Sequence, residues 1–234
     1  MSRRTIIILA LGVIAAGALV IVGVYSYEGR HYVSTDDARV AADLVSISPQ
    51  LTGSILSWQV NEGDLVKAGQ VLGRQDLGTA LSSGALSPQT MGAVGSVIAE
   101  KALLRAPISG QVIKSNAVVG EMASPGMVLA VIADTDHLYV SSNIKEGSVM
   151  RVRIGQTVDV TVDAFRGRVF PGRIQNVGRA TASTFSLLPA QNSSGNYTKV
   201  VQVVPVKIRL LDTSGAQLMV GMNAGVRIHV ESTR

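Results

Sequence analysis

The chain has 234 residues, of which 47% are hydrophobic, 4% aromatic and 16% charged, and its formal net charge is +5. It has 0 cysteines, which excludes disulfides, thiolate chemistry and cysteine-ligated zinc sites. The basic residues are scattered rather than interleaved with aromatics, which argues against nucleic-acid binding. The 24 glycines separate short runs rich in Val, Ile and Thr, a pattern typical of a mainly β chain.

An uninterrupted apolar run lies near the N-terminus. Residues 6–24 contain no charged side chain, and as a helix they would extend about 28 Å, close to the hydrocarbon thickness of a bilayer. A cleaved signal peptide is the alternative, but its apolar core is usually about 7–15 residues and ends at a small-residue cleavage site. Arg3 and Arg4 precede the run, so the positive-inside rule places residues 1–5 in the cytoplasm. We therefore predict a single transmembrane helix, with the bulk of the chain outside the cytoplasm.

The main internal pattern is a duplicated motif. Residues 48–72 and 106–129 share apolar positions and three glycines at a constant offset of 57 residues. The glycine pairs are Gly53 and Gly110, Gly63 and Gly120, and Gly69 and Gly126. Glycine suits turns that need positive φ, and the apolar runs between these glycines suit short strands. Because one copy cannot bury its apolar face alone, we predict two copies packed face to face as a small sandwich.

The rest of the chain is organised around this motif. Residues 25–44 are a predicted linker and first barrel strand, and residues 45–76 plus 104–134 are the two halves of the duplicated module. Between the halves, residues 77–103 carry helix signals interrupted by glycines, which predicts a stunted helical hairpin with an arm of about 22 Å. Residues 135–234 contain short alternating segments separated by turns, which predicts a small β-barrel.

The duplicated module resembles a biotinyl/lipoyl carrier domain split into two halves. In carrier domains, a lysine in a tight turn between the halves holds the prosthetic group. The only lysine between these halves is Lys101, and it lies in a helix-like stretch without such a turn. We therefore predict no cofactor. A carrier subunit of a biotin- or lipoate-dependent enzyme is kept as an alternative hypothesis.

Other kinds of site have little support in the sequence. The three histidines are far apart and lack partners at metal-ligand spacing. Asp36, Asp37 and Asp43 fit a solvated strand edge or a salt-bridging patch better than a calcium site, which needs denser oxygen ligands. No nucleophile elbow, phosphate loop or dinucleotide fingerprint is present. We predict no catalytic and no metal-binding residues.

The single tryptophan, Trp58, has two possible environments. It alternates with the apolar residues of its predicted strand. Packing against the barrel and contact with another protomer are both left open.

Over nearly its whole length, the chain resembles the HlyD-type membrane fusion proteins, also called periplasmic adaptors. The resemblance rests on the apolar N-terminal run, the split lipoyl-like halves and several short motifs. These motifs are Thr35-Asp36-Asp37-Ala38, Arg105-Ala106-Pro107 with Gly110, and Gly221-Met222. A further segment resembles the EmrA branch in particular, and its marker residues are Phe185, Pro189, Asn192, Gly195, Asn196 and Pro205.

The resemblance implies a non-enzymatic function without cofactors. Family members couple an exporter in the inner or cytoplasmic membrane to extracytoplasmic release of drugs or other small molecules. It implies a polytopic exporter as partner, with the major-facilitator type favoured and the ABC type possible, and a homo-oligomer, either trimer or hexamer. In the family, a long hairpin between the lipoyl halves reaches toward an outer-membrane channel, and the short segment 77–103 argues against that contact here. An anchored envelope scaffold without a transport role is a further alternative.

Overall fold

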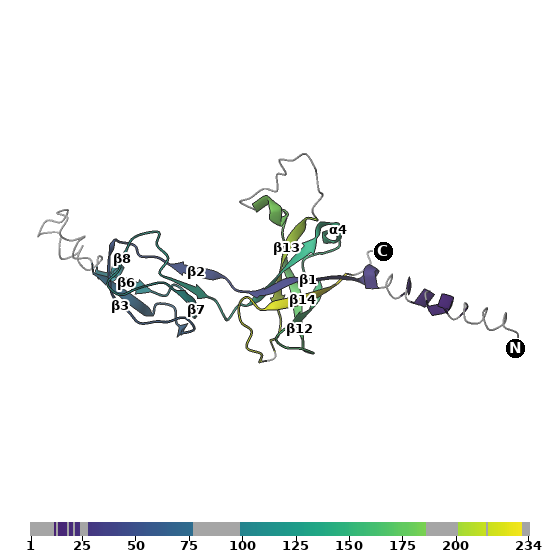
Figure 1. Cartoon of the computed structure of the whole chain (residues 1–234), viewed down its shortest axis with the longest axis horizontal. Coiled ribbons are helices and arrows are strands. Elements are labelled where there is room, and N and C mark those ends of the chain that lie inside the picture. The colour runs from purple at the N-terminus through teal and green to yellow at the C-terminus, as the bar shows by residue number, and fades with distance from the viewer. Residues whose placement is uncertain are drawn as a thin grey trace, which may run out of the picture. The chain divides into compact units, whose positions relative to one another are not determined.

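The structure is a computed structural model that describes residues 12, 14–17, 19–20, 22–23, 28–76, 99–185, 201–213 and 215–230. The chain divides into two compact units, Met1–Ala41 with Tyr139–Arg234 and Ala42–Leu138. Most of the described elements are strands, β1 to β14; the short helix α4 (Glu146–Val149) and the 3-10 turn η1 (Ala182–Phe185) lie among them, and residues 28–31 and 99–101 are also helical (Figure 1). The prediction of a mainly β chain is confirmed.

The first unit contains a closed barrel with the strand order β1-β10-β13-β12-β11-β14. Its strands are β1 (Tyr32–Ala41), β10 (Tyr139–Lys145), β11 (Thr157–Val162), β12 (Val169–Val177), β13 (Val203–Leu210) and β14 (Asn223–His229). Every neighbouring pair is antiparallel. The alternation in β11 buries Val158, Val160 and Val162 inside the barrel. Because the sheet closes on itself, no strand of it has an unpaired edge.

The second unit is a sandwich of two four-stranded sheets, β2-β9-β7-β4 and β6-β5-β3-β8. Their bounds are β2 (Leu44–Ile47), β3 (Gly53–Trp58), β4 (Leu65–Val66), β5 (Val71–Asp76), β6 (Leu103–Arg105), β7 (Gly110–Ser115), β8 (Met122–Ala123) and β9 (Ala130–Ala133). The offset of 57 residues relates β3 to β7 and β4 to β8. The paired apolar positions are buried: Ile55 and Val112 are 1% and 0% exposed, and Leu72 and Leu129 are both 0% exposed.

The two copies of the motif form a two-sheet sandwich in which each copy also gives one strand to the other's sheet, an exchange that the sequence did not predict. Strand β4 comes from the first copy but pairs with β7 of the second, and β8 of the second copy pairs with β3 of the first. The backbone bonds are reciprocal: Gly63 N donates to Val112 O at 2.7 Å, and Gly120 N donates to Ile55 O at 2.8 Å. Each copy therefore supplies a strand that the other copy's sheet needs.

Two predicted segments fall mostly outside the described residues. Of the predicted span 6–24, the described residues are helical. No helix in the described part of the chain is both long and apolar enough to cross a bilayer. Arg3 and Arg4 lie outside that part. In the predicted hairpin 77–103, the structure describes only residues 99–103, of which 99–101 are helical.

Candidate functional site

Most motif glycines of the sandwich lie in turns with positive φ. Gly63, Gly69, Gly120 and Gly126 have φ values of 95°, 82°, 90° and 94°, a region that glycine occupies without steric cost. Gly110 begins β7 under a different constraint, because a Cβ there would lie 2.0 Å from the Ala133 carbonyl oxygen. Its partner in the repeat, Gly53, begins β3 and pairs with Ala123 of β8. These turns set the register of the interlaced strands.

Trp58 is half-buried in the sandwich, where its side chain packs on this unit's own core. Its indole contacts both hydrophobic clusters of this unit. It pairs across the sheet with Gly73, where a Cβ would lie 2.6 Å from the indole Cε3. The indole Nε1 donates a hydrogen bond of 2.9 Å to Ser115 Oγ. Trp58 therefore stabilises the sandwich from within.

The motif Thr35-Asp36-Asp37-Ala38 forms an irregularity in β1, the strand that closes the barrel. The register between β1 and β14 shifts between Thr35 and Ala38, which is the signature of a β-bulge. Asp37 N donates to Thr35 Oγ1 at 3.1 Å, and Thr35 Oγ1 donates to Asn143 O at 3.0 Å. Asn143 Nδ2 donates to Asp37 Oδ2 at 3.0 Å. The motif is thus tied to the neighbouring strand β10.

Asn143 connects further motif residues and was not recognised in the sequence. It pairs with Pro205 across the β10–β13 ladder. The Pro205 carbonyl in turn accepts a hydrogen bond of 2.8 Å from Gly178 N. Nothing in the sequence marks Asn143, which is one polar residue in an alternating strand.

The terminal motif Gly221-Met222 meets the same strand β1. Gly221 N donates to Val40 O, and Val40 N donates to Met222 O, both at 2.8 Å. Gly221 has a φ of 92°, which turns the chain into β14. The terminal motif therefore bonds to β1 two residues beyond Ala38, where the barrel closes.

Of the remaining EmrA-type markers, Phe185 ends η1. Pro189, Asn192, Gly195 and Asn196 lie outside the described residues.

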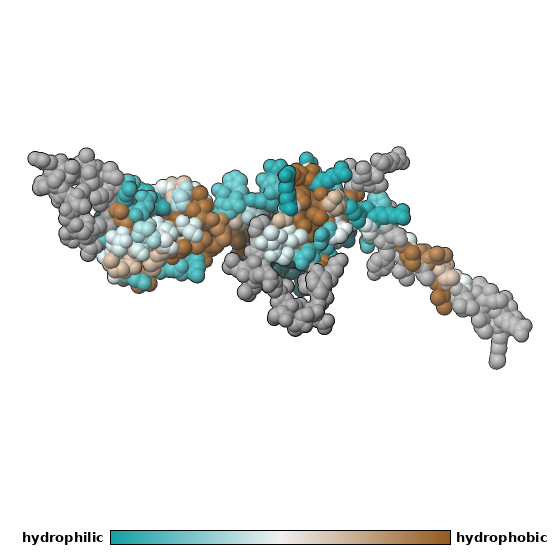
Figure 2. All heavy atoms as spheres, turned by 90° about the horizontal axis from the view of Figure 1, so that it is seen from above, coloured by the Kyte–Doolittle hydropathy of each residue, from teal (hydrophilic) through white to brown (hydrophobic). Residues whose placement is uncertain are grey.

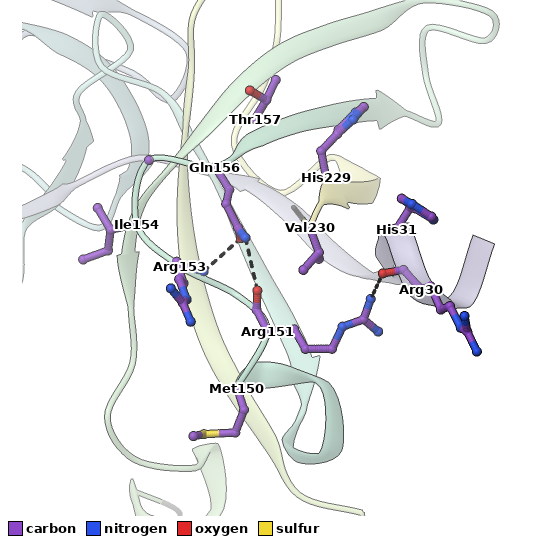
Figure 3. A pocket seen from close by; sticks show the side chains of 11 residues that line it. Arg30, His31, Met150, Arg151, Arg153, Ile154, Gln156, Thr157, His229 and Val230 are labelled. Carbon is purple, nitrogen blue, oxygen red and sulfur yellow. Dashed lines mark hydrogen bonds between the residues drawn. The ribbon is translucent and has the colours of Figure 1, made fainter. Parts of the chain in front are cut away.

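One end of the barrel carries a basic depression of about 910 Å³. Its lining residues, drawn in Figure 3, include Arg30, Arg151 and Arg153 together with the apolar side chains of Met150 and Ile154. Arg151 donates from Nη1 to the Gly29 carbonyl at 2.7 Å and from Nη2 to the Arg30 carbonyl. Residues 28–31 are helical, so Arg151 satisfies carbonyls at the C-terminal end of that turn. No motif or periodicity in the sequence marks this arginine.

Apolar side chains are also exposed on the sandwich (Figure 2). Leu56, Val118, Val119 and Met122 are 53–59% exposed. They lie close together, because Gly120 N bonds to the Ile55 carbonyl and Met122 pairs with Ser54. We call these four residues the sandwich patch.

Two of the histidines each pair with an aspartate in the described part of the chain. His137 Nδ1 lies 2.8 Å from Asp134 Oδ2, and His229 Nε2 lies 2.7 Å from Asp159 Oδ2. Burial acts to raise the pKa of Asp134, but hydrogen bonds from His137 and from the Asp136 backbone lower it below its ordinary value. The bond to Asp134 raises the pKa of His137. Across the described residues, no group of three His, Cys, Asp or Glu side chains could hold a metal ion.

Lys101 does not lie in the kind of turn that holds the prosthetic group in a carrier domain. Lys101 is exposed within the helical residues 99–101 and does not lie in a tight turn between strands. The next residue, Ala102, uses its carbonyl to accept a 2.9 Å hydrogen bond from Gln75 N. The backbone here thus leads into the β5–β6 ladder rather than presenting a lysine at a turn.

Comparison with known families and proteins identifies the fold. Residues 43–135 match the family model described as the barrel-sandwich hybrid domain of RND membrane fusion proteins. YhbJ of Bacillus subtilis (strain 168), named for an efflux system, is 35% identical over 201 residues, which cover 86% of this chain and 81% of YhbJ. The multidrug resistance protein EmrK of Escherichia coli (strain K12) is 39% identical over 108 residues, 46% of this chain and 28% of EmrK. The chain thus spans most of YhbJ but under a third of EmrK.

Solved structures agree at the level of fold. The membrane fusion protein Spr0693 from Streptococcus pneumoniae R6 superimposes with a TM-score of 0.60 at 14% identity, covering 86% of this chain and 99% of that one. The periplasmic adaptor protein EmrA superimposes with a TM-score of 0.52 at 14% identity, covering 86% and 99%. Together with the extent of the match to YhbJ, these findings confirm the resemblance in the sequence, and the chain belongs to the membrane fusion protein family.

Proposed function

We propose that this protein is the membrane-anchored adaptor of an efflux system, which couples an exporter in the inner or cytoplasmic membrane to extracytoplasmic release of drugs or small molecules. The observation that carries the proposal is the interlaced lipoyl-like sandwich joined in one chain to a barrel closed by the family motifs. YhbJ, of which the chain spans 81%, is named for an efflux system. An adaptor of this kind performs no chemistry, in keeping with the prediction that the chain is not an enzyme.

The proposed partners are a polytopic exporter and further copies of this chain. The major-facilitator type is favoured over the ABC type because the EmrA-like markers accompany the other family motifs. The sandwich patch supports a homo-oligomer, since clustered exposed apolar side chains are typical of surfaces that become covered. A trimer or hexamer would place copies of the patch around a duct.

The short segment 77–103 bears on the route of release. Even as two equal helical arms, about 27 residues would reach only roughly 20 Å. We infer that this protein does not contact an outer-membrane channel through a long hairpin. Release into the medium in a cell with a single membrane, or through another contact, fits this length.

The adaptor function is tested by export. In a strain that lacks paralogues, deletion of the gene should raise intracellular accumulation of the exported compound, and the intact gene should restore export. The protein should co-purify with a polytopic transporter from cross-linked membranes. Unchanged export and drug tolerance in the deletion strain would contradict the proposal and favour an envelope scaffold.

The alternative of a biotin- or lipoate-carrier subunit is tested by the mass of the intact protein. A biotinyl or lipoyl group would add its mass to the intact protein at Lys101, whereas an adaptor has the mass of the unmodified sequence. The Lys101→Arg variant is the matched test, because it removes the acceptor amine and keeps the charge. Full export by this variant is expected for an adaptor.

A further inference from the structure

The basic end of the barrel combines positive charge with exposed apolar side chains. Arg30, Arg151 and Arg153 line the depression, and none of the residues that line it in the described part of the chain is acidic. Met150 and Ile154 flank two of these arginines and are 86% and 67% exposed. We propose that this surface docks on the membrane itself, with its arginines on anionic phospholipid headgroups.

The segment that presents these side chains is held by internal contacts, as Figure 3 shows. Val152, between the two arginines, is only 6% exposed and anchors the segment in the core. Gln156 Nε2 donates to the Arg151 carbonyl at 3.1 Å, and Gln156 Oε1 accepts from Arg153 N at 2.9 Å. Gly155 N donates to the Ile174 carbonyl at 2.9 Å. These contacts hold the backbone of residues 150–154 in place. Less conformational entropy is therefore lost when its side chains dock.

The distance to the membrane follows from the chain. Arg30 lies only six positions after residue 24, where the predicted span ends. Even fully extended, six residues cover at most about 22 Å. Arg151 binds the carbonyls of Gly29 and Arg30, so this end of the barrel is tied to that short tether. The depression consequently lies within reach of the headgroup layer, provided that the proposed anchor spans the membrane.

The side-chain chemistry fits a lipid surface. Guanidinium groups bind phosphate through paired hydrogen bonds, and their aliphatic stems lie along apolar surface. Exposed Met and Ile next to such groups match the interfacial pattern, in which apolar side chains enter the headgroup–acyl boundary. The carboxylate of Asp159 lies near this surface, but it is paired with His229. Arg151 already donates to the Gly29 and Arg30 carbonyls, so Arg30 and Arg153 are the side chains that would contact the phosphates.

The test uses the full chain in lipid nanodiscs. Because the protein has 0 cysteines, a single cysteine introduced as Met150→Cys can be labelled specifically with an environment-sensitive dye. Nanodiscs of phosphatidylcholine alone and with phosphatidylglycerol, each with a quencher on the acyl chains and without any exporter, report contact with lipid. The matched control is Leu65→Cys, which is also exposed (75%) but lies on the sandwich.

We expect strong quenching at position 150 in the phosphatidylglycerol nanodiscs and little at position 65. Arg30→Gln and Arg153→Gln should each weaken docking roughly fivefold, and salt should weaken it further. Equal quenching at positions 150 and 65, or quenching at 150 that requires an added exporter, would overturn the proposal and assign the surface to protein contact.

Membrane insertion of the N-terminal anchor is measured separately, by co-elution of the protein with the nanodisc. Co-elution without quenching at position 150 would overturn only the docking surface. Failure to co-elute would overturn the anchor on which the proposal rests, and the docking surface with it. Export in cells is a third, independent readout.

Discussion

Trp58 and Ser115 occupy equivalent positions in the two copies of the repeat, 57 residues apart, and they hydrogen-bond to each other at 2.9 Å. The symmetry is broken around this contact. Trp58 pairs with Gly73, which has no side chain to obstruct the indole, whereas Ser115 pairs with Ala130. A bulky residue in one copy thus fills space that small residues leave, and it contacts both hydrophobic clusters of the sandwich.

Truncating Trp58 should destabilise the sandwich. Trp58→Phe loses the bond to Ser115 and should cost about 1 kcal/mol of unfolding free energy. Trp58→Ala also loses the packing and should cost about 2–4 kcal/mol, since the side chain is half-buried. Urea titration followed by circular dichroism measures both. Leu65→Ala, at a side chain 75% exposed, is the control and should change stability by less than about 0.5 kcal/mol.

Adding one methyl group at Gly110 should be far more damaging than at Gly63. At Gly110 the new Cβ would lie 2.0 Å from the Ala133 carbonyl oxygen, so β7 and β9 must separate. We expect Gly110→Ala to cost at least about 3 kcal/mol, or to prevent folding. At Gly63 the φ of 95° is strained for alanine but the space is open, so Gly63→Ala should cost about 1–2 kcal/mol. Similar thermal stabilities of the two variants would contradict the assigned clash.

The contact between Asp37 and Asn143 can be tested by exchanging the two residues. Asn143→Asp places a second carboxylate near Asp37, 3.0 Å from the present donor, and should lower the melting temperature more than Asn143→Ala. Asp37→Asn combined with Asn143→Asp restores one donor and one acceptor and should recover most of the loss. If the double variant is as unstable as the sum of the single ones, the two side chains do not interact.

The pair Asp134 and His137 should make stability depend on pH. The raised pKa of His137 means that its contribution is complete below the unfolded His pKa, about 6.5, and is lost as pH rises through the folded pKa. The lowered pKa of Asp134 means that its contribution is present above the unfolded Asp pKa, about 3.9, and is lost as pH falls through the folded pKa. The pair should therefore stabilise the folded protein most between about pH 4 and 6.5.

The measurement is the melting temperature of wild type and His137→Gln across pH 3 to 9. Their difference should be largest near pH 5 to 6 and should shrink toward both ends of the range. Both side chains reach solvent, and that of His137 is 81% exposed, so salt should reduce the difference. A constant difference across the range would show that the variant acts through packing rather than charge.

The sequence by itself determined the mainly β character, the repeat and its turns. Those features are local: alternation identifies a strand such as β11, and glycine marks backbone that needs positive φ, as at Gly63 and Gly120. The motifs around Thr35 and Gly221 were also visible in the sequence, and with them the family. What these motifs do in the barrel was not, because their effect depends on the strands beside them.

Only the tertiary structure decided which strands pair and which side chains meet across them. The strand β4 has the same local pattern whether it joins its own copy or the other, so its pairing with β7 could not be deduced. The roles of Asn143, Arg151 and Ser115 depend on partners between 57 and 122 residues away. Such long-range contacts leave no periodicity in the sequence, because they arise from the closure of the barrel and the interlacing of the repeat.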